Sequence, residues 1–535
     1  MFLRVTASAD TYITDKVIDN QYRATDANLG KAATIDLYKL YNESTISTTS
    51  SAIFERTRGL IKFNYDQLNE LMTSSLDLNH GSFKASLKMF NIQAGNPSPA
   101  NIKITVFPLA KPFDEGIGRD VSTYADLDSC NYITSSYSDG SVTTWAVTGA
   151  NQEGLLGQPG DFDIIASGNL SDGDGIKNLY RTAILPMGTE DLSVDITTIV
   201  SATVAGILPN NGLRISLSGT QDEDTKTRFV KRFATRHCTN LSLRPYVEVS
   251  YDDTINDHHE SFFFDLTGSV FLNNFERGMY MPVKSGSGGD VISGSNCMKL
   301  TLRTGSYEQS FDVSQHQAGT RVDSSIAGGT RFDDAYNYMT GVYSASISIP
   351  FSDTTAVHAA DSVNTHRVTD FAAKSGSLTF ETYWHSLDGT VGYHTGSLTV
   401  KRSNATSFFS TPRRLLFNVT NALPVYRTAD STRFRVFVTD LDAQSAATRK
   451  TVSAKSVLLD EVYYRVKDAD SGNVIVPFKT DNNATRLSTD AGGMYFDFRM
   501  DNCYVGRVYT IEFMVIDRGL STIEPANGVR FRVDA

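Results

Sequence analysis

The chain has 535 residues, which is enough for about three or four domains of ordinary size. Its formal net charge of −11 argues against a nucleic-acid binder, because such a protein needs a basic face to displace counterions from phosphates. No stretch approaches the roughly 20 apolar residues that span a bilayer, so we expect no membrane partner. Only 20% of the residues are charged, while 24 Tyr and 30 Phe supply bulk for several cores. This composition favours strands over long surface helices and predicts an all-β protein.

The N-terminus carries too short an apolar run for a secretory signal, so we expect synthesis in the cytoplasm. The four cysteines (Cys130, Cys238, Cys297 and Cys503) are scattered singly without a CxxC pair. That spacing is typical of isolated reduced thiols and argues against a zinc site or a disulfide framework.

Short segments in the first half of the chain alternate apolar and polar residues, as half-buried strands do. They lie at residues 9–13, 35–38, 58–65, 82–91, 102–107, 192–200, 212–217 and 228–233. Residues 66–76 are the best helical candidate, and residues 108–160 are rich in loop-forming residues. We therefore expect a β-sandwich with one small helix.

The strand that closes this first module begins after Pro245, because proline can start a strand but cannot sit in its middle. Val247, Val249 and Tyr251 fall on one face, and Tyr246, Glu248 and Ser250 on the other. This period-two pattern predicts a half-buried strand, with the first face in the core and the second in solvent.

Eight short motifs follow one another in residues 9–251: ADTY (9–12), NLG (28–30), RGLIKF (58–63), FDEG (113–116), Trp145, VDIT (194–197), NGL (211–213) and RPYVEVSY (244–251). In this order they resemble the DNRLRE family, a jelly-roll-like module of secreted and surface proteins. The resemblance implies structural roles for Asp10, Tyr12, Gly30, Arg58, Phe63, Trp145, Asp195, Gly212, Arg244, Pro245 and Tyr251. The family offers no shared catalytic set, so the resemblance implies neither catalytic residues nor a cofactor.

An acidic, polar run at 252–260 follows the closing strand, and further strand-like segments lie at 262–272, 297–302, 342–349, 378–382 and 397–401. At least six more follow after residue 404. We expect a DNRLRE-like jelly-roll module at 1–253, a linker at 254–260, and two immunoglobulin-like sandwiches at 261–403 and 404–535. The segment 351–377 is longer than most connections and is interpreted as a projecting loop. Trp384 is expected at the centre of the middle core.

The string from Arg244 through Phe262-Phe263-Phe264-Asp265 resembles virion proteins of tailed bacteriophages, marine ones included, in which a DNRLRE-like module precedes immunoglobulin-like domains. Residues 414–421, 431–437, 463–466, 495–498 and 531–534 resemble the terminal domains of those proteins. The resemblance implies a non-enzymatic structural protein of the virion, assembled in the host cytoplasm. Its partners would be copies of itself and tail, baseplate, neck or capsid proteins, with head decoration as the nearest structural alternative.

Three acidic stretches have side chains that can bind metal ions. Asp172 and Asp174 are spaced two apart between glycines, as a calcium site can be, but an EF-hand glutamate is missing and a surface turn is the simpler interpretation. Residues 468–472 read as a hairpin tip. His258 and His259 are adjacent, and adjacent residues of an extended chain point to opposite sides. The acidic run is therefore interpreted as a solvated joint.

Catalysis and sugar binding are the two other functions on which the sequence bears. Residues 284–290 contain serine and glycine, but a nucleophile elbow needs a strand–turn–helix that the flanking sequence does not provide, so we expect no enzyme. Tyr132, Tyr137 and Trp145 could stack on sugars if they were exposed, although Trp145 matches a family position and is expected to pack. A carbohydrate-binding adhesin that contacts a glycan of the host surface therefore remains the alternative.

Overall fold

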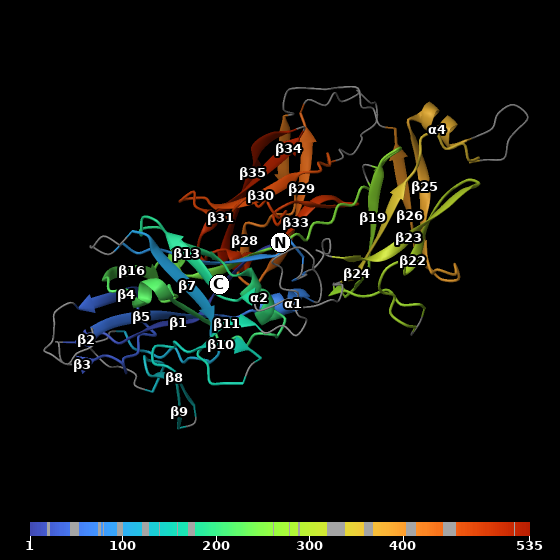
Figure 1. The fold of residues 1–535 in the computed structure, drawn as a ribbon. Coiled ribbons are helices and arrows are strands. Elements are labelled where there is room, and N and C mark those ends of the chain that lie inside the picture. The colour runs from blue at the N-terminus through green and yellow to red at the C-terminus, as the bar shows by residue number, and fades with distance from the viewer. Residues whose placement is uncertain are drawn as a thin grey trace, which may run out of the picture.

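The fold was derived from a computed structural model. It describes the chain except for residues 19–21, 43–52, 73–75, 77, 79, 94–99, 120–127, 139, 158, 169–176, 260–261, 278, 287–288, 318–337, 358–366, 403–413, 442–455 and 518. Three large sheets dominate, at residues 2–250, 262–401 and 415–534, and the helices are short (Figure 1). The all-β prediction is confirmed, and the chain is a multi-domain protein built from sandwich-like modules.

The N-terminal module is a two-layered sandwich in which the first strand belongs to both layers. The start of β1 (Phe2–Thr14) pairs with β17 (Tyr246–Ser250), and its second part pairs with β5 (Ile53–Phe63). A register shift between Ala7 and Ala9 marks the change of layer, as bulges do at sandwich corners. One layer runs β14-β6-β17-β1 and the other β13-β7-β15-β5-β1, with β4 and β16 extending the second layer beside β5.

The remaining strands of these layers are β4 (Thr34–Asn42), β6 (Lys84–Met89), β7 (Ile102–Pro108), β13 (Arg181–Leu185), β14 (Leu192–Asp195), β15 (Leu213–Leu217) and β16 (Arg228–Ala234). Smaller elements of the module are β2 (Val17–Ile18), β3 (Tyr22–Arg23), β8 (Thr134–Ser138), β9 (Ser141–Thr144), β10 (Glu153–Leu156), β11 (Ile164–Gly168), β12 (Lys177–Asn178), α1 (Asp66–Met72), α2 (Thr197–Val204), α3 (Gly219–Glu223) and the 3-10 turn η1 (Leu241–Leu243).

The strand predicted over residues 192–200 is wrong in its second half. β14 ends at Asp195, whose Oδ1 accepts hydrogen bonds from the Thr197 N–H at 2.9 Å and from the Thr197 hydroxyl at 2.6 Å. The chain then turns into α2, which buries Ile199 and Val200 in the module's core. The β-branched residues of this run favour a strand locally, but burial of the helix in the core outweighs that preference.

The middle module is a single seven-stranded sheet in the order β18-β26-β25-β22-β23-β24-β19. Its strands are β18 (Phe262–Phe263), β19 (Thr267–Asn273), β22 (Met298–Thr304), β23 (Tyr307–Gln317), β24 (Tyr338–Ser348), β25 (Ser377–His385) and β26 (Gly392–Lys401), with a small ribbon β20 (Phe275–Glu276) and β21 (Met279–Tyr280) beside them. The two end strands, β18 and β19, are close in sequence, so the sheet curls around one core. Trp384 is 2% exposed in that core.

The segment 351–377 contains a helix that the sequence analysis did not anticipate. α4 (Val368–Ser375) buries Val368 and Ala372 in the middle core and ends at Gly376, whose φ of +71° is the left-handed conformation typical of a helix C-terminus. Residues 358–366 lie outside the described part of the chain. The described ends of the segment therefore belong to the packed module.

The C-terminal module is again a two-layered sandwich. One layer contains β27, β29, β33 and β32, and the other contains β31, β30, β34, β35 and β28. The strands are β27 (Leu415–Val419), β28 (Val425–Arg427), β29 (Ser431–Asp440), β30 (Val462–Asp468), β31 (Val474–Val476), β32 (Ser488–Asp490), β33 (Gly493–Arg499), β34 (Val508–Asp517) and β35 (Leu520–Asp534), with the 3-10 turn η2 (Met500–Asn502). β30 and β31 form the hairpin expected around residues 468–472.

A partly buried histidine makes the middle module sensitive to acid. His316 lies edge-on against Phe271 at a centroid distance of 4.9 Å, and burial lowers its pKa from 6.5 to about 4. The unfolded chain binds this proton near pH 6.5 and the folded chain only near pH 4, so the free energy of unfolding falls as the pH drops through that window.

We therefore expect acidification from pH 7 to pH 5 to destabilise this module through His316 by roughly 1–2 kcal/mol. In the His316→Asn variant the loss should be smaller by that amount, and thermal unfolding of both full-length chains at the two pH values measures the difference. Equal losses in the two chains would contradict the assignment.

Candidate functional site

The strand that closes the first sandwich has two buried faces. Val247, Val249 and Tyr251 lie in the N-terminal core, as the alternation predicts. Tyr246, Glu248 and Ser250 on the other face are only 8%, 9% and 2% exposed. The prediction of a half-buried strand is therefore wrong, because the C-terminal sandwich covers the polar face. We call the outer face of β1, β17 and β6, with the C-terminal residues that contact it, the interlocking face.

The first residues of β1 reach into the C-terminal module. Leu3 and Val5 belong to the N-terminal core, but Phe2 points the other way and is a member of the C-terminal core. The nitrogen and the oxygen of the Asn502 side-chain amide both bond the backbone of this strand. Its amide donates to the Phe2 carbonyl at 3.1 Å, and its oxygen accepts from the Arg4 N–H at 2.8 Å.

The Arg4 side chain makes three contacts on the interlocking face. Its guanidinium donates to the Ile475 carbonyl at 2.6 Å and to the Tyr504 hydroxyl at 3.2 Å. The same group lies 4.5 Å from the centroid of the Tyr246 ring, in a cation–π contact. Arg4 therefore links the two strands of the first sandwich to two segments of the last one.

Charged and amide groups continue the contact along β17 and β6. Glu248 pairs with Lys479 at 2.6 Å, and Lys84 pairs with Asp481 at 2.6 Å. The Asn482 amide donates to the Ser250 hydroxyl at 2.8 Å and to the Ser82 carbonyl at 2.9 Å. The Lys84 pair is exposed and contributes little, whereas the bonds at the buried Ser250 and Glu248 replace lost hydration and fix the register of the two modules.

The segment expected as a linker lies along the C-terminal module. Ile255 donates its N–H to the Ser488 hydroxyl at 3.2 Å and accepts from the Thr489 N–H at 2.8 Å. The Thr489 hydroxyl donates to the Asp257 carbonyl at 3.1 Å. Nearby, His258 Nδ1 accepts from the Ser269 N–H at 3.1 Å. The described residues of this segment are therefore bonded into the surrounding modules.

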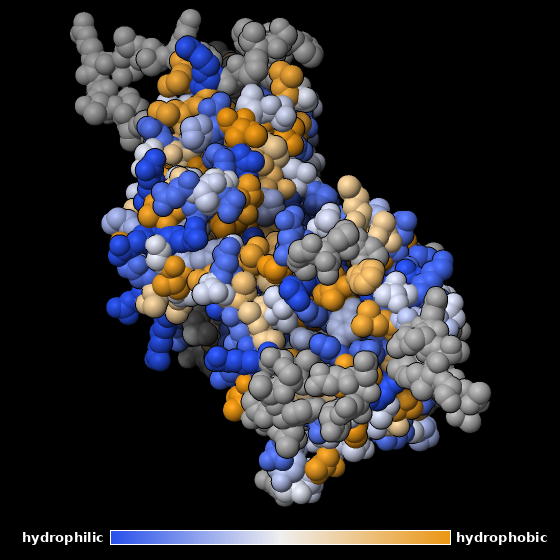
Figure 2. All heavy atoms as spheres, turned by 90° about the vertical axis from the view of Figure 1, so that its left-hand side faces the viewer, coloured by the Kyte–Doolittle hydropathy of each residue, from blue (hydrophilic) through white to orange (hydrophobic). Residues whose placement is uncertain are grey.

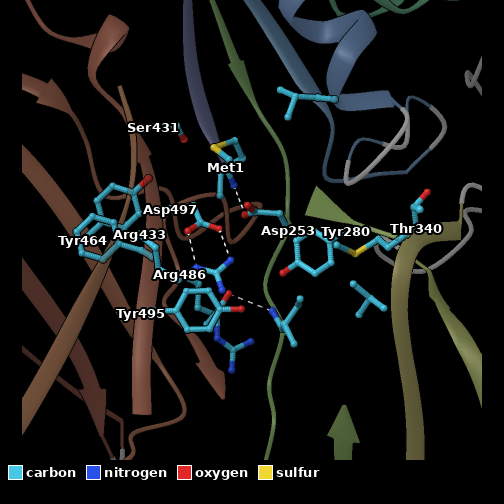
Figure 3. Close-up of a pocket in the computed structure, with 17 residues that line it drawn as sticks. Met1, Asp253, Tyr280, Thr340, Ser431, Arg433, Tyr464, Arg486, Tyr495 and Asp497 are labelled. Carbon is cyan, nitrogen blue, oxygen red and sulfur yellow. Dashed lines mark hydrogen bonds and ion pairs between the residues drawn. The ribbon is translucent and has the colours of Figure 1, made fainter. Parts of the chain in front are cut away.

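A cavity of about 190 Å³ lies where the three modules meet (Figure 3). Asp253 points into it and pairs with the amino group of Met1. On the C-terminal side, Arg433 forms a two-pronged pair with Asp497, with both N–O distances 2.8 Å, and lies 4.1 Å from the Tyr495 ring centroid. These charges are already partnered, so the cavity is a polar seam between modules.

A second group of polar residues lies at the far end of β1, inside the first module. Asp10 comes from β1, Glu115 from the loop after β7, and Arg236 and His237 from the segment after β16. One ligand atom each from Asp10, Glu115 and His237 lie within 4.8 Å of one another. We call these three residues and Arg236 the Asp10 cluster.

The carboxylates of the Asp10 cluster are held differently. Arg236 donates to both oxygens of Glu115 at 2.5 and 2.6 Å, and the Asp10 N–H donates to the same carboxylate at 2.9 Å. Although burial acts in the opposite direction, these bonds hold the pKa of Glu115 below its usual value. Asp10 is 0% exposed, and burial raises its pKa to about 7. Its Oδ2 accepts from the Arg236 N–H at 2.6 Å, while its Oδ1 has no hydrogen-bond partner.

Several motif positions from the sequence analysis surround the Asp10 cluster. Asn28 ties the loops together, since its amide donates to the Glu115 and Cys130 carbonyls and its oxygen accepts from Gly30 and Gly118. A Cβ on Gly30 would lie 1.8 Å from the Glu115 carbonyl oxygen, so only glycine fits there. The Arg244 side chain donates to the Cys238 carbonyl at 3.1 Å, next to the cluster.

The other motif residues contribute to packing, ion pairs and turns. Phe63, Trp145 and Tyr251 are buried, and Tyr12 packs at the edge of the core. Arg58 pairs with Asp222 at 2.5 Å in the interior, and Asp195 bonds the start of α2. Gly212 has a φ of +105°, and Pro245 directly precedes β17.

The remaining candidates from the sequence either do not form a site or lie outside the described part of the chain. Asp172, Asp174 and Ser287 are in undescribed segments. Tyr132 and Trp145 are buried, at 7% and 4% exposure, so neither can stack on a sugar. Tyr137 is 39% exposed. In the part of the chain that the structure covers, no helix is both long and apolar enough to cross a membrane.

Sequence reasoning did not single out the interlocking face, or His237 and Arg236. Arg4 was a usable signal, because it is a charged residue between two apolar residues at the start of the chain. Its position predicts a polar contact on the outer face of that strand. For Lys479, Asn482 and Asn502 we find no local signal, because their partners lie hundreds of residues away in the chain.

Comparisons with known proteins leave the family undefined. No protein-family model matches the chain, and no curated protein matches it. Among solved structures, a titin fragment is 5% identical, and the match covers 53% of this chain and 95% of the titin chain, with a TM-score of 0.13. A putative membrane-anchored protein from Corynebacterium diphtheriae is 8% identical, with coverages of 94% and 96% and a TM-score of 0.15. The extracellular domain of protocadherin gamma B4 is 10% identical, with coverages of 98% and 61% and a TM-score of 0.12.

At these TM-scores the likenesses carry no argument about fold or function. The resemblance to DNRLRE-type modules therefore stays a prediction from the sequence motifs.

Removing Arg4 tests the interlocking face. We expect Arg4→Ala to lower the stability of the first and last modules by about 1–3 kcal/mol, because it leaves a buried carbonyl without its donor and removes the contact with Tyr246. Thermal unfolding of the full chain measures the loss. Arg303→Ala is the matched control: Arg303 also lies over a tyrosine, Tyr383 at 4.6 Å, and pairs with an acid, Glu308, but it is exposed. Equal effects of the two substitutions would contradict a special role for Arg4.

Proposed function

We propose that the chain is a non-enzymatic structural protein of a tailed-phage virion, which acts through contacts with copies of itself and with tail, baseplate or neck proteins. The sequence motifs that resemble such virion proteins supply the direction of this proposal. The observation that carries it is the interlocking face, because it joins two sandwiches from opposite ends of the chain through a buried surface. Head decoration is the nearest structural alternative.

A stiff frame is what an assembly protein needs. Phe2 and the paired Glu248 and Lys479 hold the first and last sandwiches against each other, and the middle module stands beside them (Figure 1). Such a frame presents its outer faces in fixed positions, so binding to a neighbour costs little ordering entropy. Contacts with neighbours in a particle would add to the stability of the frame.

The surface is compatible with contacts at several places. On the face shown in Figure 2, hydrophobic residues form small separate groups among hydrophilic ones. Single exposed apolar side chains such as Met187 (73%), Ile184 (57%) and Phe229 (57%) lie on the N-terminal module. Mixed surfaces of this kind are as apolar as those of ordinary non-obligate interfaces.

If the proposal is correct, a tailed phage encodes this sequence, and mass spectrometry of its purified particles tests the virion role. We expect the chain among the virion proteins, at about six or twelve copies per particle if it belongs to a symmetric ring of the tail or neck. Hundreds of copies would favour head decoration instead. Absence of the chain from purified particles would contradict a virion role.

A second function, binding of a host glycan, is favoured by one observation. The hairpin β8–β9 extends from the edge of the first module, and it places Tyr137 opposite Val142 with exposures of 39% and 56% (Figure 1). Asp114 accepts from the Tyr137 N–H at 2.5 Å and fixes the backbone below the ring. An exposed aromatic ring on a fixed backbone can stack on a sugar face.

A glycan array probed with the full-length chain tests this alternative. If it is correct, the chain binds at least one glycan, and Tyr137→Ala lowers that binding at least about tenfold through the lost stacking. Phe229→Ala, which removes an exposed aromatic ring elsewhere, should leave binding unchanged. No binding on the array, or equal binding by the Tyr137 variant, would exclude this role for the hairpin.

A further inference from the structure

The Asp10 cluster has the composition of a metal site. It brings two carboxylates and one imidazole from three separate segments to within 4.8 Å of one another. Imidazole together with carboxylate is a donor set suited to zinc and related divalent transition metals. Ligand atoms around tetrahedral zinc lie about 3.3–3.5 Å apart. Glu115 and His237 are partly exposed, so small side-chain rotations can close this gap.

The position of Asp10 supplies an independent observation. The residue is 0% exposed, and its Oδ1 has no hydrogen-bond partner, although its Oδ2 is bonded to the Arg236 backbone. A buried acceptor without a partner is costly. A proton on Oδ1 would not remove the cost, because the resulting O–H would then need an acceptor. A cation that binds Oδ1 satisfies this atom directly.

Arg236 bonds both oxygens of Glu115, including Oε1, which also accepts from the Asp10 N–H and lies 3.3 Å from His237 Nε2. An ion between the three ligands therefore has to displace one bond of Arg236. Its side chain is 34% exposed, so it can turn towards solvent and free one oxygen of Glu115. A divalent cation bound by two carboxylates and a neutral histidine forms a group with no net charge. Arg236 bonded to the second oxygen of Glu115 would then orient that ligand, as outer partners of metal ligands commonly do.

We propose that Asp10, Glu115 and His237 form a binding site for one divalent transition-metal cation of the zinc class. The ion would tie β1 to the loop after β7 and to the segment after β16. The site lies at the opposite end of β1 from the interlocking face, and the proposal does not depend on the virion role.

Zinc titration into the EDTA-treated full-length chain, followed by calorimetry, tests the site. We expect one equivalent of Zn²⁺ to bind to the wild type, and binding at least tenfold weaker in Asp10→Asn and in His237→Gln. Zn²⁺ should also raise the melting temperature of the wild type and not that of His237→Gln. Since Asp10 is buried and its variant could fail to fold, the partly exposed His237 keeps the test independent of folding.

His394→Gln is the matched control, because His394 is exposed on β26 in another module. It should bind zinc as the wild type does. The proposal is overturned if the wild type takes up no stoichiometric zinc, or if His237→Gln binds it as tightly as the wild type.

Discussion

The arrangement of the chain depends on one sheet layer that is buried on both of its faces. β1 and β17 turn Leu3, Val5, Val247 and Val249 into their own core, and they turn Phe2, Arg4 and Glu248 towards the C-terminal sandwich. The period of two in a strand makes this possible, because successive side chains leave the backbone in opposite directions. A layer that is covered on both faces joins two modules directly. The segment after Tyr251 also contacts the C-terminal module, through Ser488 and Thr489.

Much of the architecture could be predicted from local patterns. Alternation located most strands of the first sandwich, although it missed β13 and the first half of β1. Pro245 marked the start of its last strand, and the turn at 468–472 identified a hairpin. The burial of Glu248 could not be predicted, because its partner Lys479 is far away in the chain and an isolated glutamate on a strand is usually solvated. Where local preference and burial disagreed, burial decided, as the helix α2 shows.

The candidate metal site shows the same limit. The motif that contains Asp10 and the one that contains Glu115 were visible in the sequence, but each suggested only a structural role. His237 belongs to no motif that was recognised, and only the fold brings it to the two carboxylates. The acidic run that follows Tyr251 was a weaker guide to a metal site. Its Asp253 pairs with the amino group of Met1 in a contact between modules. Chemistry in this protein follows from which loops meet, and that is a property of the tertiary structure.

Small-angle X-ray scattering of the full-length chain tests the central claim most directly, because it reports how the three modules are placed in solution. We expect the measured profile to agree with the profile calculated for the first and last sandwiches locked together, with the middle module beside them. A profile that requires three separated modules in a row, with the first and last apart, would contradict the interlocking face and the rigid frame that the proposed function rests on.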